Sequence, residues 1–288
     1  MLISTEISSA AKLVGEEKAV EVMAKAGFDC YDFSLFPMAK YSSKEGKFLF
    51  EDHPLHGPDY LAFARRLRRV ADDCGITCNQ SHAPFPTHND KIVPYLQRAI
   101  ECSAEVGAKI CIIHPKCFST PEENAEFYGT LLPFAKSCGV RIATENMWNW
   151  DKEKDQAIPC ACSTAESFVA HVDAVNDPYL VACLDIGHAE MRGLGTGAVE
   201  MIHALGQKRL QALHIHDNDL WHDSHRLPFT MNIDFVPIVK ALKDIGYQGE
   251  FTLEVDHHLV DYGAERIDEG ARVLAESVRK LADMFSAL

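Results

Sequence analysis

Residues 181–185 read VACLD, four apolar residues that end in an acid. The same pattern recurs at RIATE (141–145), LQALH (210–214) and FTLE (251–254), and each run ends in a carboxylate or an imidazole. A short apolar run of this kind is typical of a strand that is buried on both faces. A carboxylate at the end of such a strand is costly unless it is paired or coordinated, so these ends predict a shared polar site.

Eight short apolar runs alternate with amphipathic stretches along the 288 residues of the chain. They span residues 2–7, 30–34, 76–81, 109–114, 141–145, 181–185, 210–216 and 250–254. Alternating strands and helices predict a parallel sheet, and eight such units predict a closed barrel, which typically needs about 250 residues. We therefore expect an α/β fold, a (β/α)8 TIM barrel that forms a single domain over residues 1–288.

The carboxyl-terminal ends of the strands in such a barrel converge on one mouth, where active sites lie. We therefore expect the last residues of the four runs quoted above to meet there: Glu145, Asp185, His214 and Glu254. This mixed set of oxygen and nitrogen ligands suits Mn, Mg, Co or Zn rather than a metal that prefers thiolates. The alternative is a polar layer that is satisfied without a metal. Two longer loops, 37–58 and 148–164, are expected to emerge at the same mouth as a lid or a substrate wall.

A second group of polar residues is expected around these four. We expect its members to bind the substrate, to orient a metal ligand or to hold a second metal: His82, His114, His188, His216, Asp223 and His225. His188 follows Asp185 by three residues, which places it to orient a ligand or to bind a substrate oxygen.

The charge of the chain bears on its partners. With 28 basic and 42 acidic residues, the formal net charge is −14. Proteins that grip a nucleic-acid backbone usually carry a basic patch, whereas basic residues cluster here only at residues 65–69 (RRLRR), where we expect the solvated face of a helix. We therefore expect a small-molecule partner and no nucleic acid.

The hydrophobic pattern of the chain bears on membranes and location. No apolar stretch approaches the roughly 20 residues that span a bilayer, and the first residues, MLISTEISSAAKLVGEE, do not have the pattern of a signal peptide. We expect no membrane association and a cytoplasmic location.

Three motifs carry a family resemblance: LDIGHAEMRG (184–193), LHIHDNDLWHDSH (213–225) and GYQGEFTLE (246–254). They resemble the signature of the xylose isomerase-like TIM barrel superfamily. That superfamily includes the sugar phosphate isomerase/epimerase group, tagatose/psicose 3-epimerases, hydroxypyruvate isomerase, inositol-catabolism isomerases and endonuclease IV. The resemblance covers essentially the whole chain.

The resemblance implies a ligand set and an activity. It implies one divalent metal per chain, held by Glu145, Asp185, His214 and Glu254, with His214 preferred to His216 because an acid, Asp217, follows it by three residues. It implies a metal-dependent sugar or sugar-phosphate isomerase or epimerase. Such an enzyme removes a proton from a carbon beside a carbonyl to give an enediolate, which the metal stabilises. The expected acid–base pair is Glu145 and Glu254.

Two alternatives stay open. Endonuclease IV uses nine ligands for three zinc ions, and this chain offers a residue of the right type for each: His82, His114, Glu145, Asp185, His188, His214, Asp223, His225 and Glu254. A metal-dependent phosphodiester hydrolase is therefore the first alternative, although the net charge and the loop residues 218–221 count against it. A non-catalytic sugar-binding barrel is the second. Should the substrate carry a phosphate, the candidates to bind it are Lys116 and Arg192.

Overall fold

Eight parallel strands form a closed ring in the computed structural model, which describes residues 1–288. In ring order they are β1 (Ile3–Thr5), β2 (Cys30–Ser34), β5 (Thr77–His82), β6 (Ile110–Ile112), β7 (Arg141–Glu145), β10 (Leu180–Asp185), β11 (Leu210–His214) and β12 (Phe251–Leu253). The ring is completed between β1 and β2 and between β11 and β12, where two backbone hydrogen bonds join each pair of strands. Asp29 N donates to Ile3 O over 3.0 Å and Ile7 N to Asp32 O over 3.2 Å. Ile215 N donates to Thr252 O over 2.9 Å and Glu254 N to Ile215 O over 3.1 Å. The predicted (β/α)8 barrel is confirmed.

The ring strands coincide with the eight apolar runs of the sequence, with differences of one or two residues at several ends. β6 ends at Ile112 rather than at residue 114, and β11 ends at His214 rather than at residue 216. In both places the chain leaves the ladder after one more backbone bond, from Ile113 to Ala143 and from Ile215 to Thr252. The residues beyond these bonds are therefore free to turn toward the mouth.

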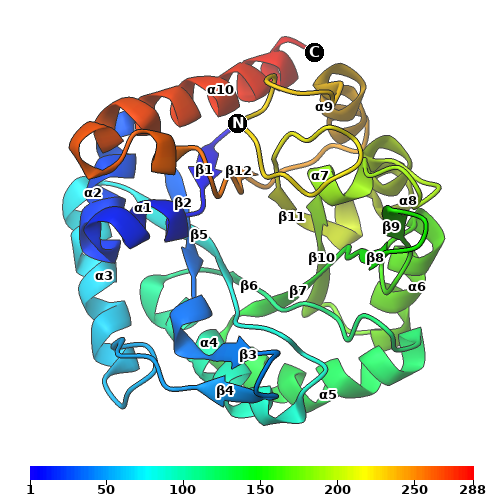
Figure 1. Cartoon of the computed structure of the whole chain (residues 1–288), viewed down its shortest axis with the longest axis horizontal. Helices are drawn as coiled ribbons and strands as arrows, with labels where there is room; N and C mark the ends of the chain where they lie inside the picture. Colours follow the sequence, from blue (N-terminus) through cyan, green and yellow to red (C-terminus); the bar gives the residue numbers. More distant parts are fainter.

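Helices surround the ring (Figure 1). They are α1 (Ser8–Val14), α2 (Glu16–Ala26), α3 (Tyr60–Cys74), α4 (Val93–Val106), α5 (Pro121–Cys138), α6 (Ala165–Val175), α7 (Ile186–Ala189), α8 (Ala198–Arg209), α9 (Phe235–Asp244) and α10 (Ile267–Ala287). Their starts and stops follow local chemistry. Thr120 and Glu123 form a reciprocal cap at the start of α5, and Gly139 ends that helix in the left-handed conformation. No helix is both long enough and apolar enough to cross a membrane.

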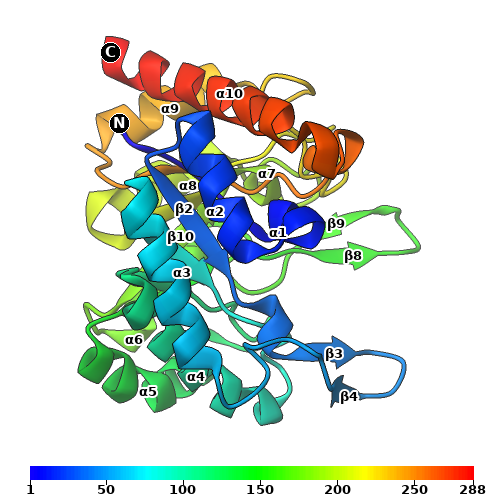
Figure 2. The same ribbon diagram turned by 90° about the vertical axis from the view of Figure 1, so that its left-hand side faces the viewer.

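The two long loops each contain a β-hairpin. β3 (Lys40–Ser42) pairs antiparallel with β4 (Lys47–Leu49), and β8 (Asn149–Asp151) pairs antiparallel with β9 (Gln156–Ile158). Both hairpins project from the same end of the barrel (Figure 2). They follow β2 and β7 respectively, so they stand over the carboxyl-terminal mouth.

The inside of the ring explains why the strand ends converge. A small apolar cluster fills it, separate from the main core between helices and strands, and is made of Ile110, Ile112, Ala143, Val181, Cys183 and Ala212. Side chains two positions apart point to the same face of a strand. Glu145, Asp185 and His214 each lie two residues beyond a member of this cluster. They therefore continue its inward-facing rows and form a polar layer above it.

Candidate active site

Four side chains converge above the apolar cluster, and we call them the carboxylate cluster: Glu145, Asp185, His214 and Glu254. The first three end β7, β10 and β11, and Glu254 directly follows β12. One donor atom from each lies within 4.8 Å of the others. All four residues are buried. The structure thus brings together the four residues predicted as metal ligands.

His214 is held from both ring nitrogens. Its Nδ1 lies 2.7 Å from Oε1 of Glu145 and 3.3 Å from Oε2 of Glu254. Its Nε2 donates over 3.1 Å to Oδ2 of Asp32, a residue of β2. A metal-binding histidine commonly gives its outer N–H to a carboxylate, which fixes the ring and its tautomer. His214 has this arrangement, with Nδ1 turned toward Glu145 and Glu254.

Charge interactions dominate the ionisation of the carboxylate cluster. Burial alone would raise the pKa of Glu145, but His214 and His114 hold that pKa well below its usual value. The pKa of Glu254 is also lowered against the effect of burial, by His214 and His82 among others. Both carboxylates are therefore ionised at neutral pH, the form that binds a cation.

Two buried carboxylate oxygens of the carboxylate cluster indicate whether a cation would fit there. Oδ2 of Asp185 is buried and makes no hydrogen bond, and Oε2 of Glu145 is buried without one although Nε2 of His114 lies 3.0 Å away. Such atoms cost free energy unless something satisfies them. A divalent cation would satisfy both, and three carboxylates with one imidazole form a donor set that suits Mn, Mg, Co or Zn. The residues present fit a metal ion.

A second group lies nearer the rim, and we call it the histidine cluster: His188, His216, Asp223 and His225. Its donor atoms also lie within 4.8 Å of one another. Asp223 is the centre, with its Oδ2 3.3 Å from Nε2 of His188 and its Oδ1 3.2 Å from Nε2 of His225. The ring of His216 stacks on that of His225 with 4.1 Å between centroids. Nε2 of His216 and Oδ1 of Asp223 have no hydrogen-bond partner.

Protons can balance the charge of the histidine cluster. Burial would lower the pKa of His188, but Asp185 and Asp223 raise it to about 10. Burial also opposes the charged form of His225, yet the nearby carboxylates of Asp223 and Glu254 raise its pKa to about 11. Despite its burial, Asp223 has its pKa lowered by His188 and His225. This cluster therefore contains its own counterions.

One glycine allows the histidine cluster to pack. A Cβ at Gly187 would lie 1.9 Å from Cε1 of His216. Only a residue without a side chain therefore fits at position 187 of the LDIGH motif. This close approach lets the buried ring of His216 reach Asp185, whose Oδ1 lies 3.1 Å from its Nε2.

His82 and His114 contact each other and two acids of the carboxylate cluster. Their Nε2 atoms lie 2.7 Å apart. His114 also approaches Oε2 of Glu145 at 3.0 Å, and His82 approaches Oε1 of Glu254 at 3.3 Å. Burial is the main cause that lowers the pKa of His114, which favours a neutral ring.

A cavity of about 410 Å³ opens above these groups. Seven of the ten residues singled out in the sequence line it, namely His82, His114, Glu145, His188, Asp223, His225 and Glu254. The other three, Asp185, His214 and His216, are fully buried. All ten therefore belong to one site at the barrel mouth.

The two cations proposed for a phosphate do not line this cavity. Lys116 pairs with Asp90 over 2.8 Å, and the guanidinium of Arg192 lies over the ring of Trp221 at 5.3 Å. Both are engaged with other side chains.

Three polar residues of the site were missed in the sequence. Asp32 holds His214, and Gln80 donates to the same Oδ2 of Asp32 over 2.8 Å. Asn146 accepts from the backbone N–H of Asp185 over 2.7 Å and donates to its carbonyl over 2.8 Å. The available signal for Asp32 was an acid inside a buried apolar run, two residues before the run ends.

Comparison with known proteins identifies the family. A family model described as "Xylose isomerase-like TIM barrel" matches residues 20–281. The chain belongs to this family. Among solved structures, a D-tagatose 3-epimerase-like protein has a TM-score of 0.71 at 20% identity, covering 98% of this chain and 99% of that one. The IolI protein with a binding zinc atom has a TM-score of 0.72 at 17% identity, covering 100% of this chain and 99% of that one.

One curated relative also matches. The uncharacterized protein MJ1311 of Methanocaldococcus jannaschii is 26% identical over 191 residues, which make up 60% of this chain. The match spans 62% of the length of that relative. Together with the two structures, it supports the family fold over the barrel.

Proposed function

We propose that this member of the xylose isomerase-like family is a metal-dependent isomerase or epimerase of sugars. The observation that carries the proposal is the carboxylate cluster, in which ionised Glu145 and Glu254 both approach Nδ1 of His214 at the floor of the mouth cavity. The names of the structural neighbours support it, since one is a D-tagatose 3-epimerase-like protein and another binds zinc.

The metal would be held by the carboxylate cluster, one ion per chain. When bound, a divalent cation supplies Lewis-acid polarisation of the substrate carbonyl and stabilises the negative charge that develops on it. Isomerisation and epimerisation both require the loss of a proton from the carbon beside that carbonyl and its return to a different position or face. The chain must therefore provide both a base and an acid.

Glu145 and Glu254 are the proposed base and acid. They come from β7 and β12, which lie three places apart in the ring, so they approach a bound sugar from different sides. One would accept the proton to leave an enediolate, and the other would return a proton. Their titrations are coupled through His214, so the pair acts as one unit.

His188 is proposed to hold a substrate oxygen. Its Nδ1 faces the carbonyl of Asn146 at 2.9 Å, which fixes the ring, and its Nε2 is on the side of Asp223 and the cavity. Because its pKa is raised to about 10, it is a hydrogen-bond donor at neutral pH. His82, His114 and His225 line the same cavity and are proposed to contact the substrate's hydroxyl groups.

Solvent exchange tests the proposed activity. The protein would be loaded with Mn or Co and incubated in deuterated water with a panel of ketoses and ketose phosphates. We expect deuterium at a carbon next to the carbonyl, seen by NMR, in at least one sugar. If none of the sugars that bind takes up deuterium under any metal, the proton-transfer function is refuted and a sugar-binding barrel is favoured.

One observation favours a second candidate, a metal-dependent phosphodiester hydrolase. The residues counted as nine possible ligands lie around one cavity, and the histidine cluster also has unpaired atoms. Against it, no lysine or arginine lines the cavity, so a phosphodiester finds no cationic side chain there. Duplex DNA with an abasic site, offered with Zn or Mn at low salt, separates the two candidates. Enzyme-like nicking with two or three metals per chain would favour the hydrolase.

A further inference from the structure

A second cavity lies beside the active-site cavity. Its volume is about 360 Å³, and its lining is Phe36, Ala39, Lys40, Tyr41, Ser43, Phe85, Pro86 and His88. Phe36, Phe85, Pro86 and His88 line both cavities. The two spaces therefore adjoin, and we call them together the cleft, which lies between the carboxylate cluster and the hairpin β3–β4.

Aromatic rings stand at the junction of the two cavities. The rings of Phe36 and Phe85 meet edge to face, with 5.2 Å between centroids. Phe36 also packs on His82 at 4.9 Å, and Phe85 stacks on His114 at 5.3 Å. The walls of the second cavity are thus fixed by the same histidines that contact Glu145 and Glu254.

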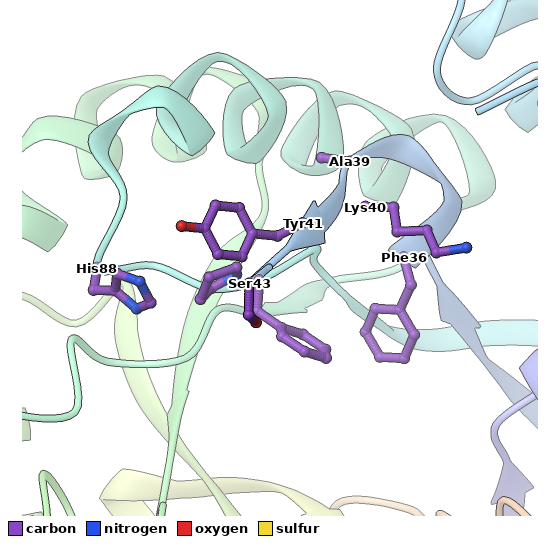
Figure 3. A pocket seen from close by; sticks show the side chains of 8 residues that line it. Phe36, Ala39, Lys40, Tyr41, Ser43 and His88 are labelled. Atoms are coloured by element: carbon purple, nitrogen blue, oxygen red, sulfur yellow. The ribbon is translucent and has the colours of Figure 1, made fainter. Parts of the chain in front are cut away.

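The outer wall of the second cavity is also tied down. Tyr41 packs on Phe48 across the hairpin at 5.2 Å, and Phe48 packs on Tyr95 of α4 at 5.8 Å. Figure 3 shows Tyr41 and His88 on one side of the space and Phe36 on the other. A wall held in this way is already formed before a ligand arrives, which lowers the cost of binding.

The chemistry of this lining suits a sugar ring. Aromatic faces pack against apolar C–H surface, and the hydroxyls of Tyr41 and Ser43 with the His88 ring supply hydrogen-bonding groups around it. The one cation, Lys40, lies within 3.4 Å of Glu51, and its side chain extends away from Tyr41 in Figure 3. Neither cavity therefore offers a cluster of cations for a phosphate.

We propose that the cleft binds an unphosphorylated keto-disaccharide. Its ketose unit, with the carbonyl free, lies at the carboxylate cluster, and its second sugar ring lies between Phe36, Phe85 and Tyr41. The role of the ketose unit rests on the proposed function, whereas the placement of the second ring rests on the second cavity alone. The site would thus select for a glycosyl substituent and against a phosphate.

The experiment compares four sugars on the Mn-loaded protein: fructose, fructose 6-phosphate, and fructose with a glucosyl unit on O4 or on O6. Two readouts are taken, kcat/KM for deuterium uptake and Kd by calorimetry. We expect at least one glucosyl-fructose to have a kcat/KM at least about tenfold higher, and a Kd at least about tenfold lower, than both other sugars, as burial of one ring face allows. Tyr41→Ala should bring the disaccharide-to-fructose ratio to about one.

Phe50→Ala is the matched control, because Phe50 is an exposed aromatic residue just beyond β4 that does not line either cavity. It should keep the wild-type ratio. A preference for fructose 6-phosphate, or an equal loss for fructose and disaccharide in Tyr41→Ala, would overturn the proposal. If no sugar exchanges deuterium, the proposed function fails while the Kd ratio still decides the second-ring site. Equal Kd values for disaccharide and fructose would then overturn that site as well.

Discussion

The carboxylate cluster and the histidine cluster lie side by side, but their buried charges are neutralised in different ways. The first has three acids around one imidazole, and it retains unpaired oxygens on Glu145 and Asp185. The second has three imidazoles around Asp223, and two of these rings have pKa values raised to about 10 and about 11. Buried charges need counterions. The histidine cluster obtains them by taking up protons on two rings. In the carboxylate cluster only one ring can do so: despite its burial, His214 has its pKa raised by Cys183, Glu254 and Glu145. Three acids then face one imidazolium, so we expect a cation to supply the remaining positive charge.

The two clusters also differ in their support. Three members of the carboxylate cluster end ring strands and continue inward-facing rows of the barrel. Asp223 and His225 lie instead in the loop that follows β11, and His225 has a positive φ of 43°. Binding sites on strands are held more precisely than sites on loops. We therefore expect the single tight metal site at the carboxylate cluster, with the histidine cluster serving the substrate.

Loss of metal is the largest effect expected. Asp185→Ala should abolish metal retention, because it removes a ligand from the carboxylate cluster, while the circular dichroism of the barrel is unchanged. His225→Ala, the matched change in the other cluster, should keep about one metal per chain. Elemental analysis after gel filtration measures both. Full metal content in Asp185→Ala, or equal loss in the two variants, would contradict the assignment of the metal site to the carboxylate cluster.

The two histidines of the LHIH segment test the same difference between the clusters with two residues that are only two positions apart. His214→Ala should lose metal because Nδ1 of His214 faces Glu145 and Glu254. His216→Ala should keep it, since Nε2 of His216 faces Asp223 of the histidine cluster and, of the carboxylate cluster, only Asp185. The opposite result would exchange their roles.

The next effect concerns turnover. Glu145→Gln and Glu254→Gln keep an oxygen for the metal but remove the capacity to accept a proton. Each should lower kcat by at least about 10²-fold, the usual size of a general acid–base contribution, while much of the substrate affinity remains. The measurement is the rate of deuterium uptake with metal content checked in parallel. Exchange that persists in both variants would place the base elsewhere in the cavity.

A smaller effect is expected from the residue behind His214. Asp32→Asn weakens the hydrogen bond that orients Nε2 of His214 and should lower metal affinity by about 10–100-fold, as is typical of such supporting partners. Asp29→Asn is the control, because Asp29 lies just before the same strand and contacts Ile3 and Arg279 instead. Competition with a chelator gives both Kd values. Unchanged affinity in Asp32→Asn would mean that packing alone fixes the His214 ring.

These residues show what the sequence could and could not predict. The strands were predictable because each is a short apolar run, and convergence of Glu145, Asp185 and Glu254 follows once a barrel is assumed. Asp32 and Gln80 were missed because they lie inside strands, where the residue that points inward depends on the register between neighbours. The second cavity joins the β3–β4 hairpin to the loop after β5. Such contacts between loops leave no periodic signal in the sequence.

The smallest expected effect tests whether buried acidic side chains without counterions extend beyond the carboxylate cluster to Glu6, at another strand of the barrel. Glu6, just after β1, is 3% exposed, and burial together with Asp256 raises its pKa to about 8. An acid whose pKa is raised on folding stabilises the fold fully below its ordinary pKa, and this contribution is lost as the pH rises through about 8. Glu6→Gln should therefore resist unfolding better than wild type at pH 9, by on the order of 2 kcal/mol, with much less difference at pH 4.

Urea unfolding of the metal-free protein at the two pH values measures this difference. Gln still offers an oxygen to the backbone N–H of Ser9, which now donates to Glu6 over 3.0 Å, so the cap of α1 is kept. Equal stability of the two proteins at pH 9 would show that Glu6 is ionised there at no cost. Buried acids without counterions would then be confined to the carboxylate cluster, and the two clusters would differ more strongly in how their buried charges are neutralised.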